Sequence, residues 1–257
     1  MNVFDVLHID RSQIDDSYLR HLVARDGPLV DITTSELRER RLRALVPTEA
    51  TDGAPAEVVA SVRRLFEGES YTVDALLEAS ADHPVIAQIA RQESYHTRIL
   101  STLLRALGQP EARTEKRKPP LVLRWLLLGV VRLPESISTV LLFIGEFAGV
   151  LLLRELRRAL EASGRDELVP LLDEILIDEL GHLAYNHAKL SAFQLRIAAM
   201  IARPMLWAAA AREPLARDSF RAAHKLTWAE VSSGFRSAAW LPALEPSPTA
   251  EPSPTAA

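Results

Sequence analysis

The chain has 257 residues, of which 48% are hydrophobic and 25% are charged, and its formal net charge is −4. This length is enough for one substantial hydrophobic core, or at most two small ones. The absence of cysteine excludes disulfides, thiolate nucleophiles, iron–sulfur clusters and cysteine-ligated zinc. Charges of both signs are interspersed, so no basic field for nucleic acid is evident and we expect no nucleic-acid partner.

Residues 1–54 are predicted to form an N-terminal helical extension. The opening "MNVFDVLHIDRSQ" lacks the basic stretch and apolar core of a signal peptide, so a cytoplasmic location is expected. Farther on, "TTSELRERRLRAL" offers a capping threonine followed by a glutamate, which predicts a basic amphipathic helix. The segment "PTEATDGAP" indicates a loop before the main domain, which we place at residues 55–240.

The main domain is rich in Leu, Ala, Arg and Glu, which favours helix. Breaks at "DHP", "GQPEARTEKRKPP" and "SGRDELVP" predict four long helices, at about 56–81, 85–107, 135–162 and 168 to beyond 195. More helix is expected to about residue 239. Residues 241–257, which include "EPSPTAEPSPTAA", are expected to be a disordered Pro/Ser/Thr tail.

The four long helices predict an all-α fold made of two antiparallel hairpins joined by a long crossover. That arrangement is a four-helix bundle of the ferritin-like kind, here with extra N- and C-terminal helices. The connection contains the apolar segment 121–133, "LVLRWLLLGVVRL", which is most simply a buried crossover helix. A wall over a substrate channel and a membrane-contacting face are the alternatives for this segment.

The segment 136–153, "SISTVLLFIGEFAGVLLL", is nearly long enough to span a membrane. Glu146 lies in its middle, and a carboxylate there would be costly in lipid. We therefore expect a helix buried in protein, with a task for the acid. Peripheral membrane association is the alternative.

Two Glu-x-x-His pairs occupy positions where an apolar helix stripe would otherwise continue. Glu93 and His96 fill a gap between Ile89 and Leu100 in the second helix, within "QESYH". In the fourth helix Glu179 and His182 stand in the same relation, within "DELGH". Because positions i and i+3 share one helix face, each pair can hold one metal ion.

Each of the other two helices places one glutamate on its apolar stripe. Glu69 follows the stripe of the first helix, whereas Glu67 lies about 200° round the helix from it. Glu146 follows the stripe of the third helix, and Glu155 faces the opposite side. Buried carboxylates persist when they are paired or coordinate metal. Carboxylate oxygens with two imidazoles suit Fe or Mn, and two ions would share bridging carboxylates.

The whole pattern, over roughly residues 56–195, resembles the ferritin-like di-iron carboxylate superfamily. That resemblance implies a pair of iron ions, or a Mn/Fe pair, with the ligands Glu69, Glu93, His96, Glu146, Glu179 and His182. "IDELGH" is also similar to the Asp-Glu-x-x-His of bacterial multicomponent monooxygenases and the ribonucleotide reductase small subunit. By this likeness Asp178 would orient His96, and Gln92 would occupy the corresponding place beside His182.

The resemblance implies an O2-dependent oxygenase or oxidase whose bound metals carry the catalysis. Hydroxylation, desaturation, N-oxygenation and deformylation are all within reach of related sites. Gly145, Ala148 and Gly149 flank Glu146 and could leave room for O2 and substrate. The apolar surroundings favour a small hydrophobic or amphipathic organic substrate.

Iron handling is the rival class, as a ferritin-like ferroxidase or a peroxide-scavenging protein. The chain is long for a ferritin, and without cysteine it has no rubredoxin-type domain. Electrons would therefore come from an external donor, a ferredoxin or a reductase, or from the substrate. The sequence does not decide the oligomeric state.

Overall fold

A computed structural model describes residues 10–26, 36–46, 55–79, 84–109 and 133–223. Every regular element in these ranges is helical, and none of the described residues forms a strand. The predicted crossover segment 121–133, apart from its last residue, lies outside the described residues. So do the predicted helix beyond residue 223 and the predicted tail at 241–257.

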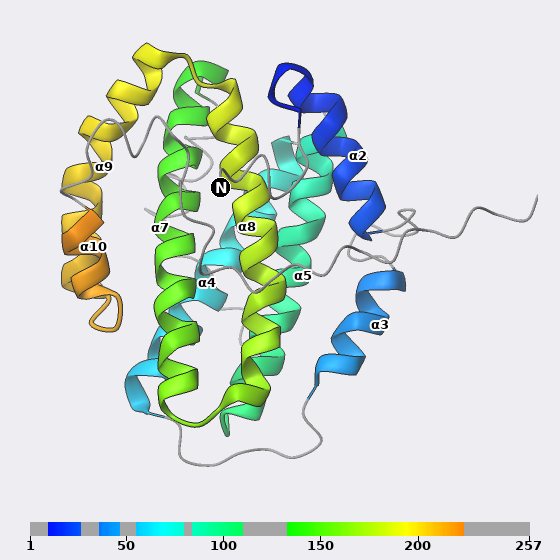
Figure 1. Cartoon of the computed structure of the whole chain (residues 1–257), viewed down its shortest axis with the longest axis vertical. Helices are drawn as coiled ribbons and strands as arrows, with labels where there is room; N and C mark the ends of the chain where they lie inside the picture. Colours follow the sequence, from blue (N-terminus) through cyan, green and yellow to red (C-terminus); the bar gives the residue numbers. More distant parts are fainter. Residues whose placement is uncertain (1–9, 27–35, 47–54, 80–83, 110–132, 224–257) are drawn as a thin grey trace, which may run out of the picture.

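Four long helices form the bundle, as two antiparallel hairpins. In the first hairpin, α4 (Ala56–Ala79) packs along α5 (Pro84–Ala106), and in the second α7 (Glu135–Ala162) packs along α8 (Val169–Lys189). The hairpins meet through contacts of α5 with α8 and of α4 with α7 (Figure 1). The predicted all-helical class is therefore confirmed for the described part of the chain.

The turn between α7 and α8 explains why the second hairpin closes tightly. Gly164 has a φ of 68°, a left-handed conformation that glycine adopts without steric cost. The Arg165 N–H donates to the Leu160 carbonyl at 2.9 Å, and the Gly164 N–H donates to Glu161 at 3.0 Å. These bonds satisfy the last carbonyls of α7 in the manner of a Schellman turn.

Helix α8 ends earlier than the sequence predicted. The expected helix ran beyond residue 195, whereas α8 stops at Lys189 and α9 (Ala192–Arg212) begins three residues later. Ser191 is the reason, because it caps α9. Its side chain accepts from the Gln194 N–H, and the Gln194 side chain accepts from the Ser191 N–H. After this corner, α9 and α10 (Arg217–Ala223) pack on the outside of α7.

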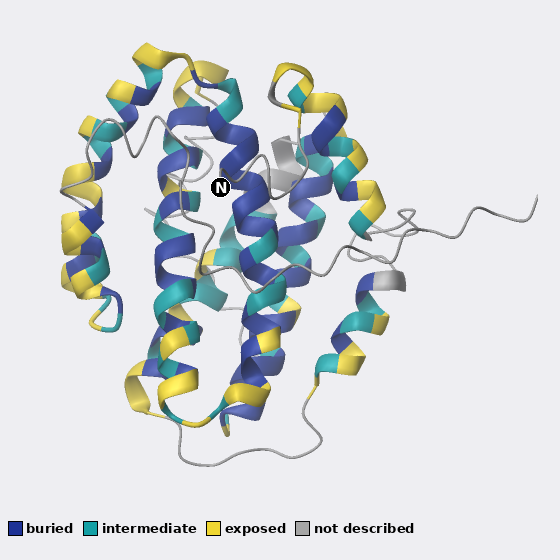
Figure 2. Ribbon diagram, viewed as in Figure 1, coloured by how far each residue is buried: buried dark blue, intermediate teal, exposed yellow. Residues whose placement is uncertain are grey.

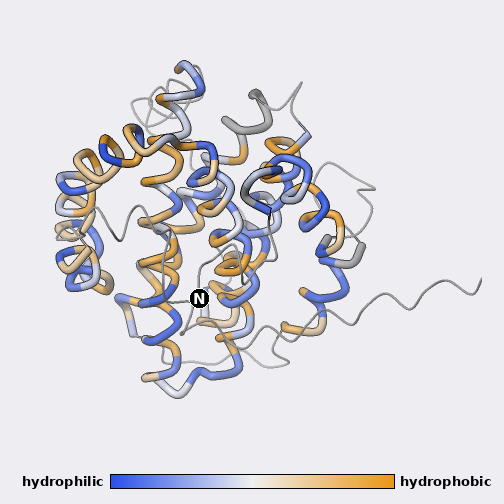
Figure 3. Tube along the Cα trace, turned by 45° about the horizontal axis from the view of Figure 1, so that its top comes forward, coloured by the Kyte–Doolittle hydropathy of each residue, from blue (hydrophilic) through white to orange (hydrophobic). Residues whose placement is uncertain are grey.

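Buried apolar side chains fill the interior of the bundle, and the exposed residues lie on its outer faces and at its ends (Figure 2). Hydrophobic and hydrophilic positions alternate along the bundle helices, as expected for amphipathic helices (Figure 3). Among the described helices only α7 is long and apolar enough to cross a membrane. However, 56% of its most apolar window is buried within the protein, which fits the core helix of a soluble protein.

The N-terminal extension contributes two described helices, α2 (Ile14–Asp26) and α3 (Glu36–Leu45). Both lie against the bundle on the side formed by α5 and α8 (Figure 1). Tyr18, Leu22 and Leu42 are buried in this contact and join the main hydrophobic core. Arg38 of α3 is only 2% exposed, which is unusual for a charged side chain and calls for a partner.

Candidate metal centre

The two Glu-x-x-His pairs lie on the helices α5 and α8, which face each other across the bundle. Glu93 and His96 come from α5, and Glu179 and His182 come from α8. Both histidines are fully buried, and the two glutamates are 2–3% exposed. The helical spacing places each pair on one face, and the packing of α5 against α8 brings the two faces together.

Single glutamates from α4 and α7 complete the cluster. Glu69 and Glu146 reach the same place from the other side of the bundle, and both keep some solvent exposure. Two neighbouring acids lie outside the cluster. Glu67 is in neither group of potential ligands found among the described residues. Glu155 turns outward and accepts hydrogen bonds from Arg158 at 2.8 Å and from Ser219 at 2.6 Å.

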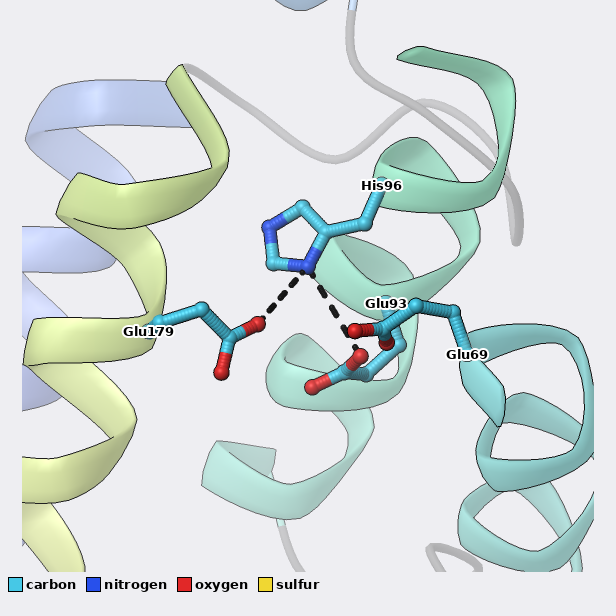
Figure 4. Close-up of side chains that lie close together, drawn as sticks. All are labelled: Glu69, Glu93, His96 and Glu179. Carbon is cyan, nitrogen blue, oxygen red and sulfur yellow. Dashed lines mark ion pairs between the residues drawn. The ribbon is translucent and has the colours of Figure 1, made fainter. Parts of the chain in front are cut away.

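The six side chains fall into two overlapping groups of potential ligands. One group is Glu69, Glu93, His96 and Glu179, and the other is Glu93, Glu146, Glu179 and His182. Within each group the potential ligand atoms all lie within 4.8 Å of one another. Figure 4 shows the first group, with the His96 ring between the carboxylates of α5 and α8. Glu93 and Glu179 belong to both groups.

Hydrogen bonds at the back of the rings fix both imidazoles. His96 Nε2 lies 3.0 Å from Asp178 Oδ2, and His182 Nε2 lies 2.9 Å from Gln92 Oε1. Both oxygens accept, so each Nε2 carries a hydrogen and donates it. The Nδ1 atoms are thereby directed into the carboxylate cluster. Asp178 and Gln92 therefore lie directly behind His96 and His182, respectively.

The Nδ1 atoms point between carboxylates rather than at any one of them. His96 Nδ1 lies 3.0 Å from Glu179 Oε1, and His182 Nδ1 lies 3.2 Å from Glu93 Oε1. Because Nε2 carries the hydrogen of a neutral ring, each Nδ1 is an acceptor that faces carboxylate oxygens, and neither makes a hydrogen bond with a described residue. Ring nitrogens and carboxylates that converge in a buried site can hold a metal ion among them. The residues therefore fit a metal site.

The pKa values of the carboxylates reflect their crowding in a buried site. Burial, and then the negative charge of a neighbouring glutamate, raises the pKa of both Glu69 and Glu146 well above the usual value. Burial also acts to raise the pKa of Glu93, but its contacts with Glu69, His182 and His96 lower it well below the usual value. The cluster does not hold four free negative charges unless positive charge is supplied.

For the two histidines, burial acts to lower the pKa and the neighbouring carboxylates act to raise it. Burial acts to lower the pKa of His182, yet the adjacent Glu179 and Glu93 carboxylates raise it to about 9. The pKa of His96 is raised well above its usual value by Asp178, Glu179 and Glu93, against the same effect of burial. A raised pKa favours the protonated ring, and a proton on Nδ1 competes with a metal ion for the same nitrogen.

Asp178 is the centre of a buried network behind the site. Its Oδ1 accepts from Gln92 Nε2 at 3.0 Å and from Arg38 Nη2 at 2.9 Å, and Arg38 Nη1 donates to Oδ2. Arg25 Nε of α2 lies 3.3 Å from the same carboxylate. Burial acts to raise the pKa of Asp178, but the charges of Arg25 and Arg38 hold it well below the usual value.

Roles for Arg25 and Arg38 were not predicted from the sequence. The only signal for Arg38 was the basic amphipathic helix predicted within the extension, which contains several arginines. Helical periodicity alone did not indicate which of them would be buried. With Asp178 and Gln92 included, the hydrogen bonds run without a break from His96 through Asp178 and Gln92 to His182.

The small residues of α7 occupy different places relative to the cluster. A Cβ built on Gly149 would lie 3.8 Å from Glu179 Oε2, so this glycine borders the site directly. Gly145 is exposed, and a Cβ there would meet nothing within 4 Å among the described residues. Ala148 is partly buried. Of the three, Gly149 is the one that brings backbone close to a potential ligand.

Comparison with protein-family models, with curated proteins and with solved structures finds no match for this chain. The interpretation of the centre therefore depends on its own geometry and on the chemistry of its donor atoms.

Proposed function

We propose that this protein is a ferritin-like dinuclear metal protein, and that with two iron ions it acts as an O2-dependent oxygenase or oxidase. One observation carries the proposal. Two imidazole Nδ1 atoms and four carboxylates converge in two overlapping groups that share Glu93 and Glu179. A lone Glu-x-x-His pair occurs often by chance, whereas two facing pairs, each completed by a further glutamate, make a paired-ion site.

The charges around the centre support two divalent cations. Four glutamates would balance the charge of two such ions, while Arg38 and Arg25 balance Asp178 and Glu174 just behind them. The donors are hard oxygens with one imidazole for each ion, a set that suits Fe or Mn. Glu69 and His96 would belong to one ion, Glu146 and His182 to the other, and Glu93 and Glu179 would bridge them.

A reduced iron pair bound here would supply the electrons and the open coordination positions needed to activate O2. The chain's own residues have three separate tasks. Asp178 and Gln92 hold the imidazoles in orientation. Buried apolar residues on both sides of Glu146 along α7, such as Phe143, Ile144 and Phe147, would keep bulk water from the interior. Because the chain has no cysteine, an external donor such as a ferredoxin or reductase would deliver the electrons.

The side of the bundle formed by α4 and α7 is the proposed approach for substrate. Glu146 keeps 16% of its side chain exposed, whereas Glu93 and Glu179 keep only 3–4%. Gly149 borders this approach, and α7 carries apolar residues on both sides of Glu146. An apolar route of this kind favours a small hydrophobic or amphipathic organic substrate over hydrated ions in bulk.

The test is an anaerobic Fe(II) titration followed by exposure to O2. We expect saturation near two Fe(II) per chain and O2 consumption whose rate changes when a medium-chain, long-chain or aromatic amphiphile is added. Saturation near one ion, or at none, contradicts the dinuclear site. Oxidation of many Fe(II) per chain into a mineral would instead identify an iron-handling protein.

A further inference from the structure

The two metal positions differ in what stands behind their histidines. The acceptor behind His96 is the carboxylate of Asp178, and the acceptor behind His182 is the neutral amide of Gln92. A carboxylate that accepts from a metal-bound imidazole makes the ring a stronger donor, and also fixes its orientation. An amide oxygen fixes the orientation with much less effect on donor strength.

Arg38 is what keeps Asp178 in position. The two guanidinium nitrogens bind the two carboxylate oxygens separately, so the fork holds the plane of Asp178 and not only its location. Arg25 lies farther away, at 3.3 Å, and divides its donors between Asp178 and Glu174, whose carbonyl and carboxylate oxygens are each 3.2 Å from Arg25 Nη2. Of the two arginines, only Arg38 makes a bidentate pair with Asp178 among the described contacts.

The place of Arg38 in the fold is also well fixed. Its guanidinium carbon lies 4.8 Å from the centre of the Tyr95 ring, and its own carbonyl accepts from the Tyr95 hydroxyl at 3.1 Å. Tyr95 is fully buried and comes one residue before His96 on α5. Helix α3 is therefore tied to the helix that carries the histidine it influences.

We propose that Arg38 is a positioning residue for the His96 position, and that the Arg38–Asp178–His96 series makes this position bind metal more tightly than the His182 position. The inference rests on the proposed dinuclear function. It adds that the two ions load in order, the His96 position first. It also assigns the N-terminal extension to the metal centre, although Arg38 is separated from Asp178 by 140 residues of sequence.

The test uses anaerobic Co(II) titration followed by visible absorption, which reports the ligand field of each ion as it binds. In the unmodified protein we expect two steps of unequal affinity. His96→Ala should remove the tighter step, and His182→Ala the weaker step, which assigns the steps to positions. Arg38→Met should weaken the tighter step by about 10–100-fold and leave the other within about threefold.

Two further variants separate positioning from a general loss of structure. Tyr95→Phe removes the bond that holds the α3 backbone but keeps the guanidinium, so both steps should stay close to those of the unmodified protein. Arg38→Lys keeps the charge without the fork and should restore only part of the affinity lost in Arg38→Met. Equal weakening of both steps in Arg38→Met and Tyr95→Phe would overturn the proposal, as would equal affinities in the unmodified protein.

An NMR measurement on the metal-free protein tests the positioning role of Arg38 separately from the proposed dinuclear function. The Nε2–H proton of His96 should give a downfield, slowly exchanging NMR signal because it donates to Asp178 in a buried site. The signal should disappear in Arg38→Met and persist in Tyr95→Phe. A signal unchanged in Arg38→Met would refute the positioning role, even if two ions bind. If the signal behaves as expected but two ions do not bind, the dinuclear function fails and the positioning of His96 remains.

Discussion

Helices α5 and α8 differ from α4 and α7 in how they build the centre. The first pair supplies both histidines and the two shared glutamates, all nearly or fully buried. Behind these residues the hydrogen bonds continue through Asp178 and Gln92 to Arg38. The second pair supplies one glutamate each, and it also carries the exposed Gly145 and the neighbouring Gly149.

The difference shows that a single bundle can be rigid on one side of a site and accessible on the other. Buried ligands that are hydrogen-bonded from behind hold a metal in one geometry, as Asp178 and Gln92 do for the two imidazole rings. Partly exposed carboxylates have more freedom to move and leave room beside them. We therefore expect substitutions on α5 and α8 to affect metal binding, and substitutions on α7 to affect access.

The largest loss of bound metal is expected for His182→Ala, on α8. The substitution removes the only nitrogen donor of one potential ligand group, so metal content should fall from about two ions per chain to one or fewer. The control is His187→Ala, five residues later on α8. His187 is also buried, but it lies against Phe143, with ring centres 5.7 Å apart. Metal analysis after anaerobic loading measures both, and equal losses would show that the ligand assignment is wrong.

Asp178→Asn is expected to reduce metal binding less than His182→Ala does, and also to lower the free energy of unfolding. Metal affinity should fall by about 10–100-fold, since Asp178 orients a ligand without being one. The free energy of unfolding should also fall, by about 3–5 kcal/mol, because Arg38 would remain buried without its anionic partner. Denaturant titration of the metal-free protein measures the second effect. Glu174→Gln is the control. If it lowers the free energy of unfolding as much as Asp178→Asn does, Asp178 has no special role.

On the accessible side, Gly149→Trp should leave metal loading nearly intact. A Cβ at this position makes only an ordinary contact with Glu179, so the helix can accept it, but the indole must then occupy space beside the site. The effect of amphiphiles on the rate of O2 consumption should be lost. Gly68→Trp is the matched control, because Gly68 is exposed on α4 and a Cβ there meets nothing within 4 Å. Unchanged amphiphile sensitivity in Gly149→Trp would place the substrate elsewhere.

Among the proposed ligands, the smaller effect is expected for Glu69→Gln on α4. The amide keeps one oxygen donor but loses the charge, so affinity at the His96 position should fall, but by less than the loss of a whole ligand in His182→Ala costs the other position. Glu67→Gln, two residues away and outside the potential ligand groups, should bind metal like the unmodified protein. The same anaerobic titration compares the two variants. A larger loss in Glu67→Gln would mean that the helix presents a different face to the site.

Local sequence determined the helices and the polar positions on them. The 3.6-residue period alone aligns Glu93 with His96 and Glu179 with His182, and it separates Glu69 from Glu67. "SGRDELVP" ends a helix by the same kind of local rule, since Gly164 adopts a positive φ. The corner at Ser191 is also encoded locally, as Ser-x-x-Gln, although the apolar pattern alone predicted one continuous helix across it.

Only the tertiary structure decided which arginines of the extension would reach the centre. Helix α3 contains Arg38, Arg40, Arg41 and Arg43, and nothing within the helix itself distinguishes the buried one. The choice depends on Asp178 and Tyr95, which are 140 and 57 residues away along the chain. A helix's own periodicity describes its faces, but the free energy of burying a charge depends on the partner that another element brings to it.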